Sequence, residues 1–134
     1  MMTTKDRVYI CSPLSAPTTQ ETEHNMHIAR EYAREVMSEL KCRVFAPHAW
    51  LPELLDDAIP AERKLAMQFD MKLLNTCSVV VVCHPSVTAG VAKEIAEAQK
   101  LEIPIFVRPA PDKYHPARRI PEIGEDADWR AWGL

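Results

Sequence analysis

Two carboxylates of this sequence stand at helical positions where a hydrophobic side chain is expected. Glu94 lies in the stretch SVTAGVAKEIAEA, against a stripe at helical spacing that is marked by Val91, Ile95 and Ala98. Asp70 lies in AMQFDMKLL, and its neighbours three and four residues away are all apolar. Because an ionised carboxylate is costly to bury, each is either a boundary residue that reaches solvent or a group kept for chemistry. Two of them in one small chain favour chemistry, since paired carboxylates in different environments separate a nucleophile from a proton donor.

Open space and hydroxyl groups accompany these carboxylates in the sequence. Gly90 precedes Glu94 by four residues and leaves room beside it. Hydroxyls that could bind an anion gather after the first predicted strand and before the helix of Glu94, at Ser12, Ser15, Thr18, Thr19, Ser86 and Thr88. The free N–H groups at the start of that helix would add to an anion site. The sequence has three glycines and neither G-x-G-x-x-G nor a Walker loop, so it supports neither a Rossmann dehydrogenase nor a P-loop kinase.

Other polar and aromatic residues each allow two interpretations. Tyr9 lies inside the first predicted strand, where a tyrosine usually packs in the core. His48 and Trp50 follow the second predicted strand, and Asp57 comes shortly after them. Trp50 could stack on a planar ring or pack under its own loop. His84 could move a proton or be polar surface, and the residues alone leave these alternatives open.

Hydrophobic periodicity predicts the elements that would position these residues. The pattern predicts parallel strands at residues 7–11, 43–46, 78–83 and 103–107. It predicts helices at about 24–40, at 60–75 and from Ser86 or Thr88 to about 101. It also predicts a possible helical turn in the irregular stretch 47–60 and a short helix within 127–134. This order predicts an α/β three-layer sandwich with a parallel, flavodoxin-like or Rossmann-like sheet of four to five strands. Ligands bind beyond the carboxyl ends of such strands, where the polar residues gather.

Composition and charge narrow the function classes. The chain has 134 residues, of which 47% are hydrophobic, and this predicts one domain over residues 1–134. A net charge of −3 without a long basic stripe predicts no nucleic-acid partner. No apolar run approaches the length of a membrane span and residues 1–7 are polar, so we expect a cytoplasmic protein without a membrane partner. No metal site is expected, because zinc-ligand spacing is absent among Cys11, Cys42, Cys77 and Cys83.

Three segments of the chain occur in the order VYICSPLSA, FDMKLLNTCSVVVV and SVTAGVAKEIAEA. Together they resemble the nucleoside 2-deoxyribosyltransferase superfamily, which includes the 2'-deoxynucleoside 5'-phosphate N-hydrolases. The resemblance covers roughly residues 7–107, and APHAWLPELLDDAIPAER is similar to phage and bacterial members. It implies that Glu94 is the nucleophile that attacks the anomeric carbon of the sugar. It further implies that Asp70 orients and protonates the departing base and that Tyr9 positions the nucleophile. A hydroxyl at Thr88 implies a 5'-phosphate on the ligand.

The sequence departs from this superfamily at two places. Ser12-Pro13 stands where the first turn usually has glycine, and the tail HPARRIPEIGEDADWRAWGL does not align with the segment that completes a neighbouring subunit's site. The resemblance still implies a homo-oligomer, either a dimer or a tetramer. It also implies a small-molecule nucleotide or nucleoside as the ligand and no cofactor.

We therefore expect cleavage of the N-glycosidic bond of a (deoxy)nucleoside 5'-monophosphate or nucleoside, by hydrolysis or by base exchange. The residues expected to bind the substrate are Ser12, Pro13, Ser15, His48, Trp50, Asp57, Ser86, Thr88 and Gly90. Two alternatives stay open. A nucleotide sensor would keep the pocket and tolerate the loss of Glu94, whereas a hydrolase of NAD-like ribosyl substrates would release nicotinamide.

Overall fold

The computed structural model describes residues 6–14, 16–123 and 129–133. Its elements are, in chain order, β1 (Arg7–Cys11), α1 (Thr19–Leu40), β2 (Arg43–Phe45), α2 (Pro47–Trp50), the 3-10 helix η1 (Leu51–Glu53), α3 (Pro60–Leu74), β3 (Val79–Val82), α4 (Ala89–Lys100), β4 (Ile105–Ala110), β5 (Lys113–Pro116) and the 3-10 helix η2 (Trp129–Trp132). Strands and helices alternate along most of the chain, so the predicted α/β class is confirmed.

Five strands form one sheet in the order β2-β1-β3-β4-β5. The first four strands run parallel, and β5 pairs antiparallel with β4. This is the flavodoxin-like order, in which the direction of strand succession reverses between β1 and β3. The periodicity did not predict β5, because this short edge strand has exposed, partly charged residues and no apolar alternation. Its pairing with β4 follows a tight turn at Asp112, which has a φ of 59°.

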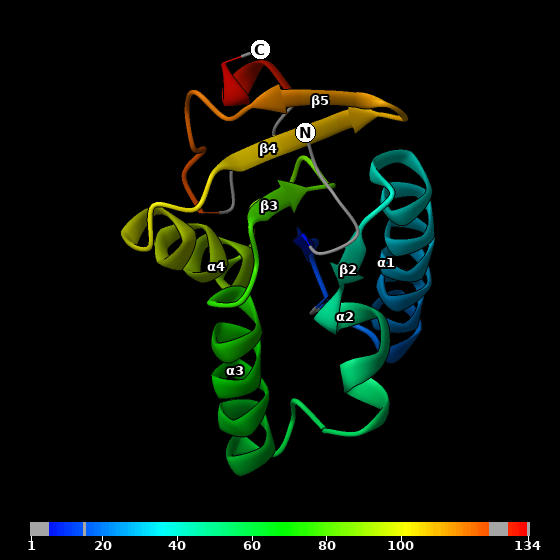
Figure 1. Ribbon diagram of the computed structural model, residues 1–134. Coiled ribbons are helices and arrows are strands. Elements are labelled where there is room, and N and C mark those ends of the chain that lie inside the picture. Colours follow the sequence, from blue (N-terminus) through cyan, green and yellow to red (C-terminus); the bar gives the residue numbers. More distant parts are fainter. Residues whose placement is uncertain (1–5, 15, 124–128, 134) are drawn as a thin grey trace.

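A helical layer covers each face of the sheet, as Figure 1 shows for α1 on one side and for α3 and α4 on the other. On the first face, α1 packs against alternate strand residues that include Val8 and Ile10. On the second face, α4 and η2 pack against the intervening residues, which include Tyr9 and Val80. Because strand side chains alternate between faces, Tyr9 points into the layer that also holds Asp70 and Glu94.

Side-chain caps set the starts of two helices. α1 begins at Thr19 rather than near residue 24, because Thr18 Oγ1 accepts a hydrogen bond of 3.1 Å from the N–H of Glu21. Of the two residues proposed to cap α4, Thr88 does so, and its Oγ1 accepts from the N–H of Val91 at 3.2 Å. Within the described residues, no helix is both long and apolar enough to cross a membrane.

A buried arginine joins β4 to α1 on the face opposite the two carboxylates. Arg108 donates to Glu35 at 2.8 Å and to both carboxylate oxygens of Glu39 at 2.6 and 3.0 Å. Tyr114 of β5 also donates to Glu39. The hydrogen bond from Arg108 holds the pKa of Glu39 below its ordinary value, although partial burial opposes that effect. The buried charge here is therefore paired and hydrogen-bonded, as is usual inside a protein.

Candidate active site

Asp70 and Glu94 line the same cavity, which has a volume of about 180 Å³ and lies between α3 and α4. Its walls also include the segments that follow β1, β2 and β3, so it lies at the carboxyl edge of the sheet where strand succession reverses. The lining residues are Leu14, His48, Asp57, Arg63, Ala66, Met67, Asp70, Met71, Thr88, Ala89, Gly90, Lys93 and Glu94. Two carboxylates that are far apart in the sequence therefore meet in one site.

Helical geometry explains which side chains reach the cavity. The lining residues of α3 run from Arg63 to Met71 at spacings of three and four residues, so they share one face of the helix. The first turns of α4 form the opposite wall, with Glu94 one turn beyond Gly90. A Cβ atom at Gly90 would have only Thr88 Oγ1 near it, at 3.9 Å, so this turn leaves open space beside Glu94.

Glu94 is the most deeply buried polar group of the cavity. It is 3% exposed, and neither of its carboxylate oxygens has a hydrogen-bond partner among the described residues. Burial raises the pKa of Glu94 from 4.5 to about 8. The nearby Tyr9 hydroxyl opposes this rise, whereas the negative charge of Asp70 adds to it. A carboxylate in this setting gives up little hydrogen bonding when it attacks an electrophile, so it suits a nucleophile.

Tyr9 places a phenol beside Glu94. The side chain is fully buried, and its hydroxyl has no well-formed hydrogen bond to any described residue. Burial raises the pKa of Tyr9 far above its ordinary value, and the charges of Glu94 and Asp70 raise it further. The phenol therefore stays protonated and can donate to Glu94 when that carboxyl group is ionised.

Asp70 is the second carboxyl group of the cavity. It is 8% exposed, and its Oδ1 has no hydrogen-bond partner among the described residues. Burial raises the pKa of Asp70 from 3.8 to about 7, and the charge of Asp57 contributes. With Glu94 titrating near 8, the pair holds a single proton mainly between about pH 7 and pH 8. One group can then act as a nucleophile while the other donates a proton.

His48 joins the cavity as a neutral ring. Its Nδ1–H donates to the carbonyl oxygen of Ser12 at 2.5 Å, since a carbonyl can only accept. Burial lowers the pKa of His48, although the hydrogen bond to Ser12 and the charge of Asp57 oppose that effect. A neutral ring that uses Nδ1 as a donor keeps Nε2 as an acceptor for a ligand.

Two cations lie at the mouth of the cavity. Arg63 of α3 and Lys93 of α4 are exposed and line it from opposite walls. In the part of the chain that the structure describes, neither forms an ion pair. Asp57 is also exposed and lines the cavity, so the two cations outnumber the exposed acid and favour an anionic ligand group near Arg63 and Lys93.

The structure brings some of the predicted binding residues together and separates others. His48, Asp57, Thr88 and Gly90 line the cavity with Glu94 and Asp70. The predicted residues Ser12, Pro13 and Ser86 do not line it, and Ser15 lies outside the described residues. Ser12 is buried, and its backbone carbonyl holds His48 in place. This contact fixes the orientation of the His48 ring.

Trp50 does not reach the cavity. It is 49% exposed and lines an apolar hollow with Phe69, while the guanidinium of Arg30 lies 6.0 Å from the centre of its ring. The reason is that residues 47–50 form the short helix α2, which lies where a helical turn was predicted. Residues two apart on a helix do not share a face, so His48 and Trp50 point to different sides.

The cavity also contains residues that we did not single out from the sequence. They are Leu14, Arg63, Ala66, Met67, Met71, Ala89 and Lys93. A signal for Met67 and Arg63 was present, because they lie three and seven residues before Asp70 and so share its helical face. Lys93 gave no such signal, since an exposed lysine on a helix is ordinary surface.

Comparisons with known proteins agree with this geometry at the level of the fold. A family model described as a domain of unknown function, DUF7768, matches residues 6–108. A 2-deoxyribosyltransferase from the psychrotolerant bacterium Bacillus psychrosaccharolyticus is similar in structure, with a TM-score of 0.55 and 16% identity over 75% of this chain and 70% of that chain. No curated protein sequence matches the chain. At this identity the structural likeness is one of fold.

Replacing Glu94 with glutamine should stabilise the fold at alkaline pH. The native pKa is about 8 against an ordinary value of 4.5, so between these values the native state binds a proton that the unfolded chain has lost. The contribution of Glu94 to the stability of the wild type is therefore full below its ordinary value of 4.5 and is lost as pH rises to about 8. At pH 9, urea denaturation should give Glu94→Gln a free energy of unfolding more than about 2 kcal/mol above the wild type, with little difference at pH 5. Glu97→Gln, on the same helix but outside the cavity, is the control, and equal gains in both variants would contradict the prediction.

Replacing Gly90 with alanine should leave the fold intact and narrow the cavity. The added methyl group meets no close atom, and alanine favours a helix over glycine by up to about 1 kcal/mol, so the melting temperature should be unchanged or higher. Because the methyl group fills the space beside Glu94, ligand affinity should fall roughly tenfold. Thermal unfolding and nucleotide titration measure the two effects. Unchanged affinity would show that the ligand does not approach this turn.

Proposed function

This chain belongs to the DUF7768 family, and we propose that it is an enzyme that cleaves the N-glycosidic bond of a nucleoside or nucleoside 5'-phosphate. The observation that carries the proposal is the meeting of Asp70 and Glu94, both buried and incompletely hydrogen-bonded, in one cavity. The fold likeness to a 2-deoxyribosyltransferase supports a substrate of the nucleoside class. So does the sequence resemblance, which assigns the same two residues to the reaction.

The reaction starts from the one-proton state of the pair with the proton on Asp70, which is the less populated arrangement because the pKa of Glu94 is about 8 and that of Asp70 is about 7. In the first chemical step, ionised Glu94 attacks the anomeric carbon of the sugar. A carbon–oxygen bond forms to Glu94 as the carbon–nitrogen bond to the base breaks, and the electron pair of that bond goes to the base nitrogen. Protonated Asp70 donates its proton to the departing base. The transition state has oxocarbenium character, so the negative charge of Glu94 stabilises it before the bond is complete.

In the second step, water or a second base attacks the anomeric carbon and displaces Glu94. Water gives hydrolysis, with its proton returning to Asp70, and a second base gives exchange. Tyr9 serves both steps as a positioning residue, because its neutral phenol lies beside Glu94 and lowers the pKa of that carboxyl group.

The cavity mouth supports an anionic substrate. Arg63 and Lys93 are free of ion pairs within the described residues, and they line the cavity together with Thr88, the N-cap of α4. Thr88 Oγ1 already accepts the N–H of Val91, so its hydroxyl hydrogen is available for a phosphate oxygen. A 5'-phosphate on the substrate satisfies these groups, whereas a bare nucleoside leaves the cations unused.

The direct test is base release from a panel of nucleosides, nucleoside monophosphates and NAD, separated by chromatography. The wild type should release base from at least one phosphorylated member. Glu94→Gln should lose roughly a thousandfold or more of this rate, because an amide cannot act as the nucleophile. Glu97→Gln should retain the rate. An undiminished rate in Glu94→Gln would exclude the proposed nucleophile, and ligand binding without release from any member would favour a sensor.

Replacing Asp70 with asparagine should change the pH profile as well as the rate. The wild-type rate should peak between about pH 7 and pH 8, where the carboxyl pair holds one proton. Asparagine cannot donate that proton, so the rate should fall roughly a hundredfold or more. The alkaline decline should also disappear, since only the ionisation of Glu94 remains. A profile that keeps its alkaline limb in Asp70→Asn would assign the acid to another group.

A further inference from the structure

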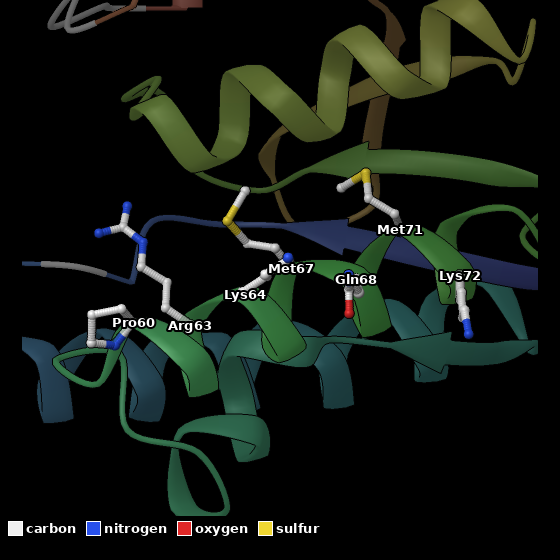
Figure 2. A pocket seen from close by; sticks show the side chains of 7 residues that line it. All are labelled: Pro60, Arg63, Lys64, Met67, Gln68, Met71 and Lys72. Carbon is white, nitrogen blue, oxygen red and sulfur yellow. The ribbon is translucent and has the colours of Figure 1, made fainter.

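The cavity that holds the two carboxylates is small for the whole of a nucleoside. Its volume is about 180 Å³, whereas small-molecule sites usually enclose about 300–1,000 Å³. Part of the substrate must therefore lie outside it. An open depression of about 700 Å³ lies on α3, and Figure 2 shows its lining residues. We call this the α3 depression, and it is lined by Pro60, Arg63, Lys64, Met67, Gln68, Met71 and Lys72.

The cavity and the α3 depression share one row of side chains. Arg63, Met67 and Met71 line both, and they are spaced four residues apart along the same side of α3. In Figure 2, Met67 and Met71 point from α3 towards α4. Asp70 lies beside this row, three residues after Met67 and next to Met71. A base that receives a proton from Asp70 therefore lies against the two methionines, at the border between the cavity and the depression.

The polar lining of the α3 depression is cationic. Arg63, Lys64 and Lys72 are exposed there, and no acidic residue lines it. None of the three forms an ion pair with another described residue. The whole chain has a net charge of −3, so this group of unpaired cations contrasts with the average surface. Its electrostatic complement is an anion.

We propose that the α3 depression is a subsite for an anionic substituent on the departing base, such as a carboxylate or phosphoryl group attached to a nucleobase. The inference rests on the proposed function, because it places the base beside Asp70. Met67 and Met71 contact the flat base, since thioethers pack well on aromatic rings. Lys64 and Lys72 then bind the substituent, and Gln68 between them offers an amide donor. The preferred substrate is a nucleotide with a modified, acidic base.

The test compares two substrates that differ only in base charge: 2'-deoxyuridine 5'-monophosphate with a 5-carboxyl group and the same nucleotide with a 5-methyl group. The wild type should prefer the carboxyl form in kcat/KM. The combined change Lys64→Gln and Lys72→Gln should lower the carboxyl-to-methyl ratio at least tenfold, mainly through KM. The control is Lys100→Gln with Lys113→Gln, which removes the same charge from exposed sites elsewhere and should preserve the ratio.

The outcomes separate this inference from the proposed function. An unchanged ratio in Lys64→Gln with Lys72→Gln overturns the subsite, and the proposed function stands if Glu94→Gln still abolishes base release. The double lysine variant could instead lose kcat/KM equally for both nucleotides and lose none for the unphosphorylated nucleosides. That result would assign the lysines to the 5'-phosphate and would also overturn the subsite.

If the wild type releases base from neither substrate, the proposed function fails and calorimetric titration with 5-carboxyuracil tests the depression alone. Binding that the lysine changes abolish and the control preserves supports an acidic-base subsite. Absence of binding, or binding that the lysine changes leave intact, overturns it.

Discussion

The energetic constraint on which the site depends is the burial of carboxyl groups without full hydrogen bonding. Arg108 shows how the same chain handles buried charge elsewhere, with Glu35 and Glu39 accepting all of its described hydrogen bonds. Glu94 has no such partner among the described residues, and Asp70 has one oxygen unpartnered. Their pKa values rise as a result, so the carboxyl groups are kept near the midpoint of their titration at neutral pH. The fold tolerates this cost because two apolar clusters, one on each face of the sheet, supply the stability.

The topology of the sheet brings the site together. Strand succession reverses between β1 and β3, so the segments after these strands diverge and leave room for a ligand. The alternation of side chains along β1 directs Tyr9 into the layer of α3 and α4, while its neighbours Val8 and Ile10 pack on α1. A shift of one residue in the register of β1 would place the phenol on the wrong face.

α3 links the chemistry of the cavity to recognition outside it. Asp70 lines the cavity, Lys64 and Lys72 line the α3 depression, and the row that includes Met67 lines both. The carboxyl groups therefore lie in the interior and the unpaired cations lie at the entrance. This separation suits a substrate whose reacting carbon becomes positive in the transition state while its periphery is negative.

Four of the five strands, the three long helices and the two unusual carboxylates could be identified from the sequence alone. Strong helical periodicity makes a polar residue within an apolar stripe visible, which identified Glu94 and Asp70 before their neighbours were known. The alternation of strands and helices likewise predicted the α/β class. Which of the residues between strands face the cavity could not be predicted, because side-chain direction there depends on local backbone geometry. His48 of α2 lines the cavity, whereas Trp50 of the same helix lines another hollow. The tertiary structure also decided the pairing of β5 and the placement of Arg63 and Lys93 at the mouth, since edge strands and exposed cations follow no pattern that periodicity can detect.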